Sequence, residues 1–98
     1  DYRSIGSLTF AEPDAEAFRC LALAERAARE GGTMPCVLNA ANEVAVASFL
    51  SDACSFTAID ACVAHCLDAH ERERVESLGQ LQDVDRWARA RAYLKAHA

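Results

Sequence analysis

Residues 34–50, MPCVLNAANEVAVASFL, decide the fold of this chain. With successive residues about 100° apart around a helix, apolar side chains such as Val37 and Ala41 cover most of the circumference. Pro35 fits the first turn, where its missing N–H would have had no partner in any case. Since a helix that is apolar on most sides is buried on most sides, we expect a central helix from just after Thr33 to about residue 50.

The polar residues of this segment gather on the one remaining side of the helix. Asn39, Asn42 and Glu43 lie there, together with Val46. Asn is unfavourable inside a helix because its amide competes for backbone hydrogen bonds, so these side chains need partners. The side is either the one wet face of the helix or a buried hydrogen-bonding patch. We expect the three polar residues to hold a neighbouring loop or an adjoining domain, and direct contact with a substrate or a catalytic loop is the alternative.

A first helix is predicted over residues 15–30. Gly31-Gly32 ends it, because Gly readily takes the left-handed conformation that closes a helix. Its apolar stripe is expected to consist of Phe18, Leu21, Ala22 and Ala28.

The third helix is predicted to begin after Phe56. Thr57 is its expected N-cap, and Asp60 lies in the first turn, where a negative charge suits the helix dipole. Apolar residues then recur at the i, i+3 and i+4 positions of an amphipathic helix. This stripe consists of Ile59, Cys62, Val63, Cys66, Leu67 and His70.

Ser77 and Gln80 resemble a capping box, which is expected to open a short turn. A fourth helix is then predicted over residues 84–97. Its inward side chains are expected to be Val84, Trp87, Ala90 and Leu94. Four helices with short connections predict an all-α fold, a small antiparallel four-helix bundle.

The composition agrees with a single helical domain. The chain has 98 residues, and its apolar residues include 21 Ala but only six Val and two Ile, which favours helices over sheet. The formal net charge is −5 with no cluster of Lys or Arg, so a nucleic-acid surface is not expected. No apolar stretch approaches the roughly 18 residues that cross a bilayer, so no membrane partner is expected either.

The N-terminal residues differ from the rest of the chain. Residues 7–10, SLTF, alternate polar and apolar side chains as an extended segment does, and Glu12-Pro13-Asp14 is expected to block its continuation. An isolated extended segment cannot satisfy its own backbone. We therefore divide the chain into an extended arm, residues 1–14, and a helical bundle, residues 15–98. The absence of an initiator Met suggests a fragment or a processed chain.

The five cysteines form no recognisable disulfide framework, which favours a reduced, cytoplasmic protein. Cys62, Cys66 and His70, with His65 nearby, are candidate zinc ligands because zinc accepts thiolate and imidazole. Positions i and i+8 of a helix are, however, about 12 Å apart along its axis, too far for one ion. We therefore assign no metal ligand. No catalytic or cofactor-binding residue is assigned either, because the sequence contains no Gly-rich phosphate loop and no paired nucleophile and base.

The central stretch carries a family resemblance. Residues 37–50, with Asn39-Ala40-Ala41-Asn42-Glu43 at their centre, resemble the signature helix near the C-terminus of the 1-deoxy-D-xylulose 5-phosphate reductoisomerases. The flanks are similar in order and spacing across nearly the whole chain. They include Leu8-Thr9-Phe10, Phe18-x-Cys20-Leu21, Gly31-Gly32-Thr33, Phe56-Thr57-x-Ile59 and Asp85-x-Trp87-Ala88-Arg89. Ala58 departs from the family, which commonly has an acidic residue there.

The resemblance implies the C-terminal helical domain of an enzyme of non-mevalonate isoprenoid biosynthesis. Such an enzyme rearranges a sugar phosphate with Mg²⁺ or Mn²⁺ and reduces the product with NADPH, and its parent protein is expected to be a homodimer. These cofactors are expected in domains that precede this region, so the fragment itself is expected to hold no cofactor and to be inactive. Its expected partner is the catalytic domain of the same polypeptide. The alternative is an independent helical module that binds a protein partner or zinc.

Overall fold

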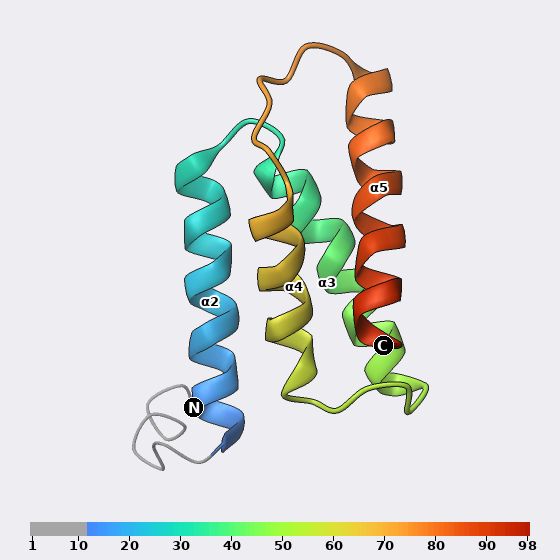
Figure 1. The fold of residues 1–98 in the computed structure, drawn as a ribbon. Coiled ribbons are helices and arrows are strands. Elements are labelled where there is room, and N and C mark those ends of the chain that lie inside the picture. The colour runs from blue at the N-terminus through green and yellow to red at the C-terminus, as the bar shows by residue number, and fades with distance from the viewer. Residues whose placement is uncertain (1–11) are drawn as a thin grey trace.

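The computed structural model describes residues 12–98 as four helices with short connections. They are α2 (Glu12–Glu30), α3 (Met34–Leu50), α4 (Ala58–Ala69) and α5 (Leu78–Ala96). Successive helices run in opposite directions (Figure 1), and the described part of the chain contains no strand. The predicted all-α, antiparallel four-helix bundle is confirmed.

Helix α3 lies at the centre of the bundle, as predicted. It packs against all three other helices, with α2 and α5 on opposite sides of it (Figure 1). Thr33 precedes its first turn, and Pro35 lies within that turn. The buried residues of α3 cover most of its circumference. They are Met34, Val37, Ala40, Ala41, Ala45 and Ser48.

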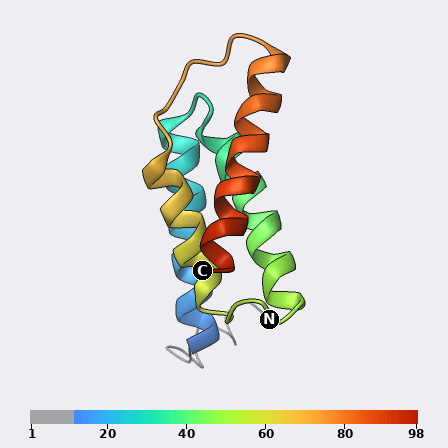
Figure 2. The same ribbon diagram turned by 45° about the vertical axis from the view of Figure 1, so that its right-hand side comes forward.

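Helix α5 turns a row of mostly alanines towards the other helices. The buried residues of this row are Val84, Ala88, Ala92 and Ala96. Small side chains on both helices allow α5 to lie close along α3, and the two run side by side in a second view (Figure 2). The Cys62 thiol of α4 donates to the Ala92 carbonyl oxygen at 3.3 Å, so α4 also approaches the α5 backbone closely.

The prediction for α5 was wrong in two respects. Ala90 is exposed and Leu94 is 69% exposed, because the row of small residues at i and i+4 spacing, rather than the bulkier row, meets α3. The helix also begins at Leu78 instead of residue 84. Ser77 Oγ accepts a hydrogen bond from the Gln80 N–H at 3.0 Å, so this cap opens α5 itself and not a separate turn.

The apolar stripe predicted for α2 was also wrong. Phe18 is 56% exposed and Leu21 is 49% exposed, and both Ala22 and Ala28 are exposed as well. The strip that faces the bundle is narrower and made of smaller side chains, because α2 packs only along one side of α3 and α4. It consists of Leu23, Ala24 and Ala27.

Two ion pairs fix how α2 is rotated against α4. Arg19 Nε contacts Asp60 Oδ2 at 2.7 Å, and Arg26 Nη1 contacts Asp68 Oδ1 at 2.8 Å. Since the two arginines are two helical turns apart on one side of α2, that side must face α4. Leu21, about 200° from Arg19 around the helix, therefore lies on the side of α2 away from α4.

The start of α2 differs from the prediction as well. The helix begins at Glu12 instead of residue 15, with Pro13 in its first turn. Pro lacks an N–H that would have had no helical partner at this position, so it starts this helix instead of blocking it. The extended segment predicted at residues 7–10 lies outside the described residues, and the division into residues 1–14 and 15–98 stays a prediction.

The stripe predicted for α4 is confirmed. Its five buried residues are Ile59, Cys62, Val63, Cys66 and Leu67, and His70 follows them half-buried. Thr57 precedes the helix as predicted, but its side chain makes no capping hydrogen bond. The Thr57 hydroxyl lies 3.2 Å from the Ser55 hydroxyl instead, because the backbone of Thr57 is itself helical.

The α2–α3 turn is tied to the connection between α4 and α5. The buried Thr33 donates its backbone N–H to the Glu73 carbonyl at 2.9 Å, and its hydroxyl accepts the Glu73 N–H at 3.0 Å. The same hydroxyl lies 2.7 Å from His70 Nε2. Gly32 has a φ of +59°, and a Cβ there would overlap the Glu73 carbonyl, so this close approach requires glycine. These contacts hold one end of the bundle together.

Candidate interdomain face

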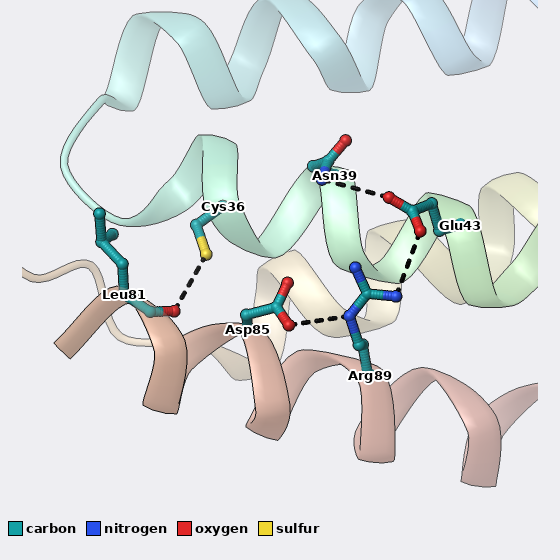
Figure 3. A network of polar contacts seen from close by, with 6 residues as sticks. All are labelled: Cys36, Asn39, Glu43, Leu81, Asp85 and Arg89. Atoms are coloured by element: carbon teal, nitrogen blue, oxygen red, sulfur yellow. Dashed lines mark hydrogen bonds and ion pairs between the residues drawn. The ribbon is translucent and has the colours of Figure 1, made fainter. Parts of the chain in front are cut away.

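Asn39, Asn42 and Glu43 of α3 are all exposed. Figure 3 shows Asn39 and Glu43 projecting from the same side of this helix. We call this strip, together with its flanks on α2 and α5, the open face. Its residues are Asn39, Asn42 and Glu43 of α3, Cys20 and Ala24 of α2, and Asp85 and Arg89 of α5. Within the described residues this polar strip is therefore open to solvent and is not buried against another helix. Asn39 Nδ2 donates to Glu43 Oε2 at 3.5 Å, a contact at the outer limit of a hydrogen bond.

An arginine from α5 completes a polar network on the open face. Arg89 donates through Nη1 to Glu43 Oε1 at 3.3 Å and through Nε to Asp85 Oδ2 at 2.8 Å (Figure 3). These two hydrogen bonds hold the pKa of the Arg89 guanidinium above its ordinary value, and the one to Asp85 has the larger effect. The network links α3 to α5 and fixes the position of Glu43.

Sequence reasoning did not assign Asp85 and Arg89 to this site. Their i, i+4 spacing on one helix was a signal that could have found the pair. Their contact with Glu43 depends on how α5 lies along α3, which only the structure gives.

Cys36 lies at the α5 edge of the open face. Its thiol donates to the Leu81 carbonyl oxygen at 3.5 Å (Figure 3). Burial raises the pKa of this thiol, and the nearby negative charge of Asp85 raises it further. The thiol is therefore protonated at neutral pH, which suits a packing role and not a nucleophile.

On its α2 side the open face contains a shallow hollow of about 240 Å³. Cys20, Ala24, Leu38, Asn39 and Asn42 line it. The Asn42 amide makes no hydrogen bond to any described residue, so both its donor and its acceptor groups are available at the surface.

The structure does not bring all the candidate zinc ligands together at one place. Cys62 and Cys66 are buried in the core, whereas the His70 ring pairs with Thr33 and packs 5.2 Å from the Trp87 ring. Between residues 12 and 98, no group of three or more His, Cys, Asp or Glu side chains is placed to hold a metal ion. None of the described helices is long and apolar enough to cross a membrane.

A larger cavity of about 490 Å³ lies at the end of the bundle between α4, α5 and their connection. His70, Glu73, Gln80 and Asp83 supply polar groups to its lining. Most of these groups already have partners within the chain. Gln80 binds Glu73 at 3.0 Å, His70 contacts Thr33, and Asp83 pairs with Arg86. The cavity therefore belongs to the region where the α2–α3 turn contacts the connection between α4 and α5.

Comparison with known proteins identifies the family. A profile described as "DXP reductoisomerase C-terminal domain" matches residues 1–91. The chain belongs to this family. The resemblance carried by residues 37–50 and their flanks is thereby confirmed, and the open face lies on the helix that carries it.

Three relatives in this family illustrate the similarity. Each is named 1-deoxy-D-xylulose 5-phosphate reductoisomerase. The protein of Trichlorobacter lovleyi is 47% identical over 94% of this chain, and that of Prosthecochloris aestuarii is 51% identical over 94%. The Bacillus subtilis protein is 49% identical over 84% of the chain. The chain spans about a quarter of the length of the curated relatives it matches, and no solved structure gives a significant match.

Proposed function

We propose that this chain is the C-terminal supporting domain of a 1-deoxy-D-xylulose 5-phosphate reductoisomerase. The parent enzyme would convert 1-deoxy-D-xylulose 5-phosphate to 2-C-methyl-D-erythritol 4-phosphate in non-mevalonate isoprenoid biosynthesis. It would use NADPH and Mg²⁺ or Mn²⁺, act in the cytoplasm and form a homodimer. Support comes from the family match over residues 1–91 and from the names of the relatives.

The chemistry itself belongs outside this chain. The sequence contains no Gly-rich dinucleotide loop, and the residues that the structure describes include no cluster suited to a metal ion. The relatives have about three quarters of their length beyond the matched segment. We therefore place NADPH, the metal and every catalytic residue in that remaining part, and we assign no reaction step to the bundle.

The observation that carries the proposed role is the exposure of a polar strip on the central helix. Three sides of α3 are packed, yet Asn39, Asn42 and Glu43 remain open on the fourth. Asn amides pair well with peptide groups of a neighbouring segment, because each offers both a donor and an acceptor. The exposed Leu21, on the side of α2 away from α4, would add an apolar contact. We propose that the open face docks on the catalytic domain of the same polypeptide.

Docking would support catalysis indirectly. Catalytic groups need a rigid surrounding to keep their geometry, and a displacement of about 1 Å can cost on the order of a hundredfold in rate. The bundle supplies a rigid body because α3 is fixed on three sides and Arg89 links it to α5. In this role the bundle braces the catalytic domain without touching the substrate.

Replacement of the matching segment in a relative tests the proposal. We expect a Bacillus subtilis reductoisomerase that carries this chain in place of its own C-terminal segment to turn over substrate within about tenfold of the parent, or roughly 1.4 kcal/mol in the barrier. The same enzyme truncated before the segment is the control and should lose activity. A folded but inactive chimera, or a truncated enzyme as active as the parent, would contradict the proposed function.

A further inference from the structure

The cations of α5 fall into two groups. Arg86 pairs with Asp83 at 2.6 Å, and Arg89 pairs with Asp85. Arg91 and Lys95, one helical turn apart on the other side of α5, form no ion pair with any carboxylate among the side chains that the structure describes, residues 18–98. An acidic chain with a net charge of −5 therefore carries two unneutralised cations on one side of this helix.

The contacts of Arg91 are weak substitutes for a carboxylate. Its Nε donates to His65 Nε2 of α4 at 3.3 Å, and its guanidinium lies 5.9 Å from the centre of the Trp87 ring. The His65 nitrogen accepts this bond only when it carries no proton. A carboxylate that reached Arg91 and Lys95 would replace this contact with a charge-assisted one.

Apolar surface lies beside these cations. Leu94 is 69% exposed, and Trp87 is only partly buried. On the α4 side the exposed residues include Ala61 and Ala69, whose small side chains leave the surface accessible to a second helix. We name the surface formed by His65, Trp87, Arg91, Leu94 and Lys95 the cationic face.

We propose that the cationic face binds an acidic amphipathic helix of a protein partner. Glu or Asp side chains spaced i, i+4 on that helix would meet Arg91 and Lys95, and its apolar residues would cover Leu94 and Trp87. The cationic face lies on the side of α5 opposite Arg89 and the open face. The inference therefore does not depend on how the open face is used.

An acidic protein segment fits this surface better than a polyanion does. Two arginine or lysine side chains neutralise too few phosphates for stable binding to nucleic acid at physiological salt. Stable binding to an anionic membrane likewise draws on a cluster of four or more basic residues. A short helix that combines two carboxylates with an apolar stripe matches both the charge and the exposed Leu94.

Trp87 makes the proposal directly measurable, because it is the one tryptophan in the chain and lies within the cationic face. The probe is an 18-residue synthetic helix with a Leu stripe flanked by Glu at i, i+4 positions, and its matched control carries Gln in place of each Glu. Addition of the Glu helix to the whole chain should change Trp87 fluorescence in a saturable manner. Binding should weaken as salt is raised, because exposed charges are screened.

Variants locate the binding surface. The double variant Arg91→Gln/Lys95→Gln should weaken binding of the Glu helix about tenfold, the sum of two exposed ion pairs. Arg29→Gln removes an exposed cation of α2 and should leave binding unchanged. Absence of binding to the Glu helix, equal binding of the Gln helix, or equal affinity of the double variant would overturn the proposal. Tighter binding to single-stranded DNA or to phosphatidylserine vesicles than to the Glu helix would overturn it in favour of those partners.

Discussion

Thr33 is the residue on which one end of the bundle depends. Its side chain is fully buried, and its hydroxyl accepts the Glu73 N–H while it lies 2.7 Å from the His70 ring. The residue precedes α3, where a Thr side chain would ordinarily cap the helix, yet it makes no capping hydrogen bond. Its hydroxyl serves the connection between α4 and α5 instead.

Removal of this hydroxyl should therefore destabilise the fold. Thr33→Val keeps the shape but leaves the part-buried Glu73 N–H without its side-chain acceptor. We expect a loss of about 1–3 kcal/mol in the free energy of unfolding, measured by urea denaturation followed by circular dichroism. Thr57→Val is the matched control, because Thr57 is exposed and makes no capping bond, and its effect should stay within about 0.5 kcal/mol. Equal losses in the two variants would contradict this role for Thr33.

Cys36 gives a prediction on pH. Because burial raises the pKa of its thiol, less of the reactive thiolate is present at a given pH in the folded chain than in the unfolded one. At pH 8, iodoacetamide should label Cys36 more slowly in the folded chain than in urea, as measured by peptide mass spectrometry. The difference should narrow as the pH rises beyond 9.0, the ordinary thiol value. Faster labelling in the folded chain would mean that the thiol is activated.

At the scale of elements, the close packing of α5 against its neighbours depends on alanine. Ala92→Leu places a large side chain at a fully buried position whose backbone carbonyl also contacts Cys62. Overpacking of this kind should cost about 1–3 kcal/mol, or more if the helices must separate. Ala90→Leu is the control on the same helix, since Ala90 is exposed, and it should change stability by no more than about 0.5 kcal/mol. Thermal denaturation of both variants measures the difference, and similar melting temperatures would refute the packing argument.

The positions of the helices along the sequence were largely predictable. Which side of each helix faces the core was predictable for α3 and α4 but not for α2 and α5. For α4 the apolar residues form one stripe, and for α3 they cover all but one polar side. In both helices the buried residues agree with this pattern. For α2 and α5 two stripes compete, one of large side chains and one of small ones. The large stripe, which includes Phe18 and Leu94, was chosen from the sequence, whereas the small stripe packs inward. Hydrophobicity alone cannot decide such a case, because the outcome depends on how closely the partner helix can approach.

At the scale of the whole molecule, the exposed apolar side chains indicate which surfaces other segments would cover. Three of the exposed large apolar side chains are Phe18 and Leu21 on α2 and Leu94 on α5. Each of them lies on or beside a surface that we propose to be covered, either by another domain or by a partner helix. The polar part of the candidate site was predictable, since Asn39 and Asn42 are out of place in a helix interior. Its links to Asp85 and Arg89 were not, because they join segments more than 40 residues apart.

The central claim is that the open face is covered in the complete enzyme. The most direct measurement compares the alkylation rate of Asn42→Cys in this chain alone with its rate in the Bacillus subtilis chimera, read by peptide mass spectrometry. Ala61→Cys, on the exposed side of α4, is the control and should react equally in both. The account predicts rapid labelling at position 42 in the isolated chain. In the active chimera the labelling should be slower by about tenfold or more, because a site covered by another domain is rarely open to solvent. Equal rates at position 42 in an active chimera would contradict it.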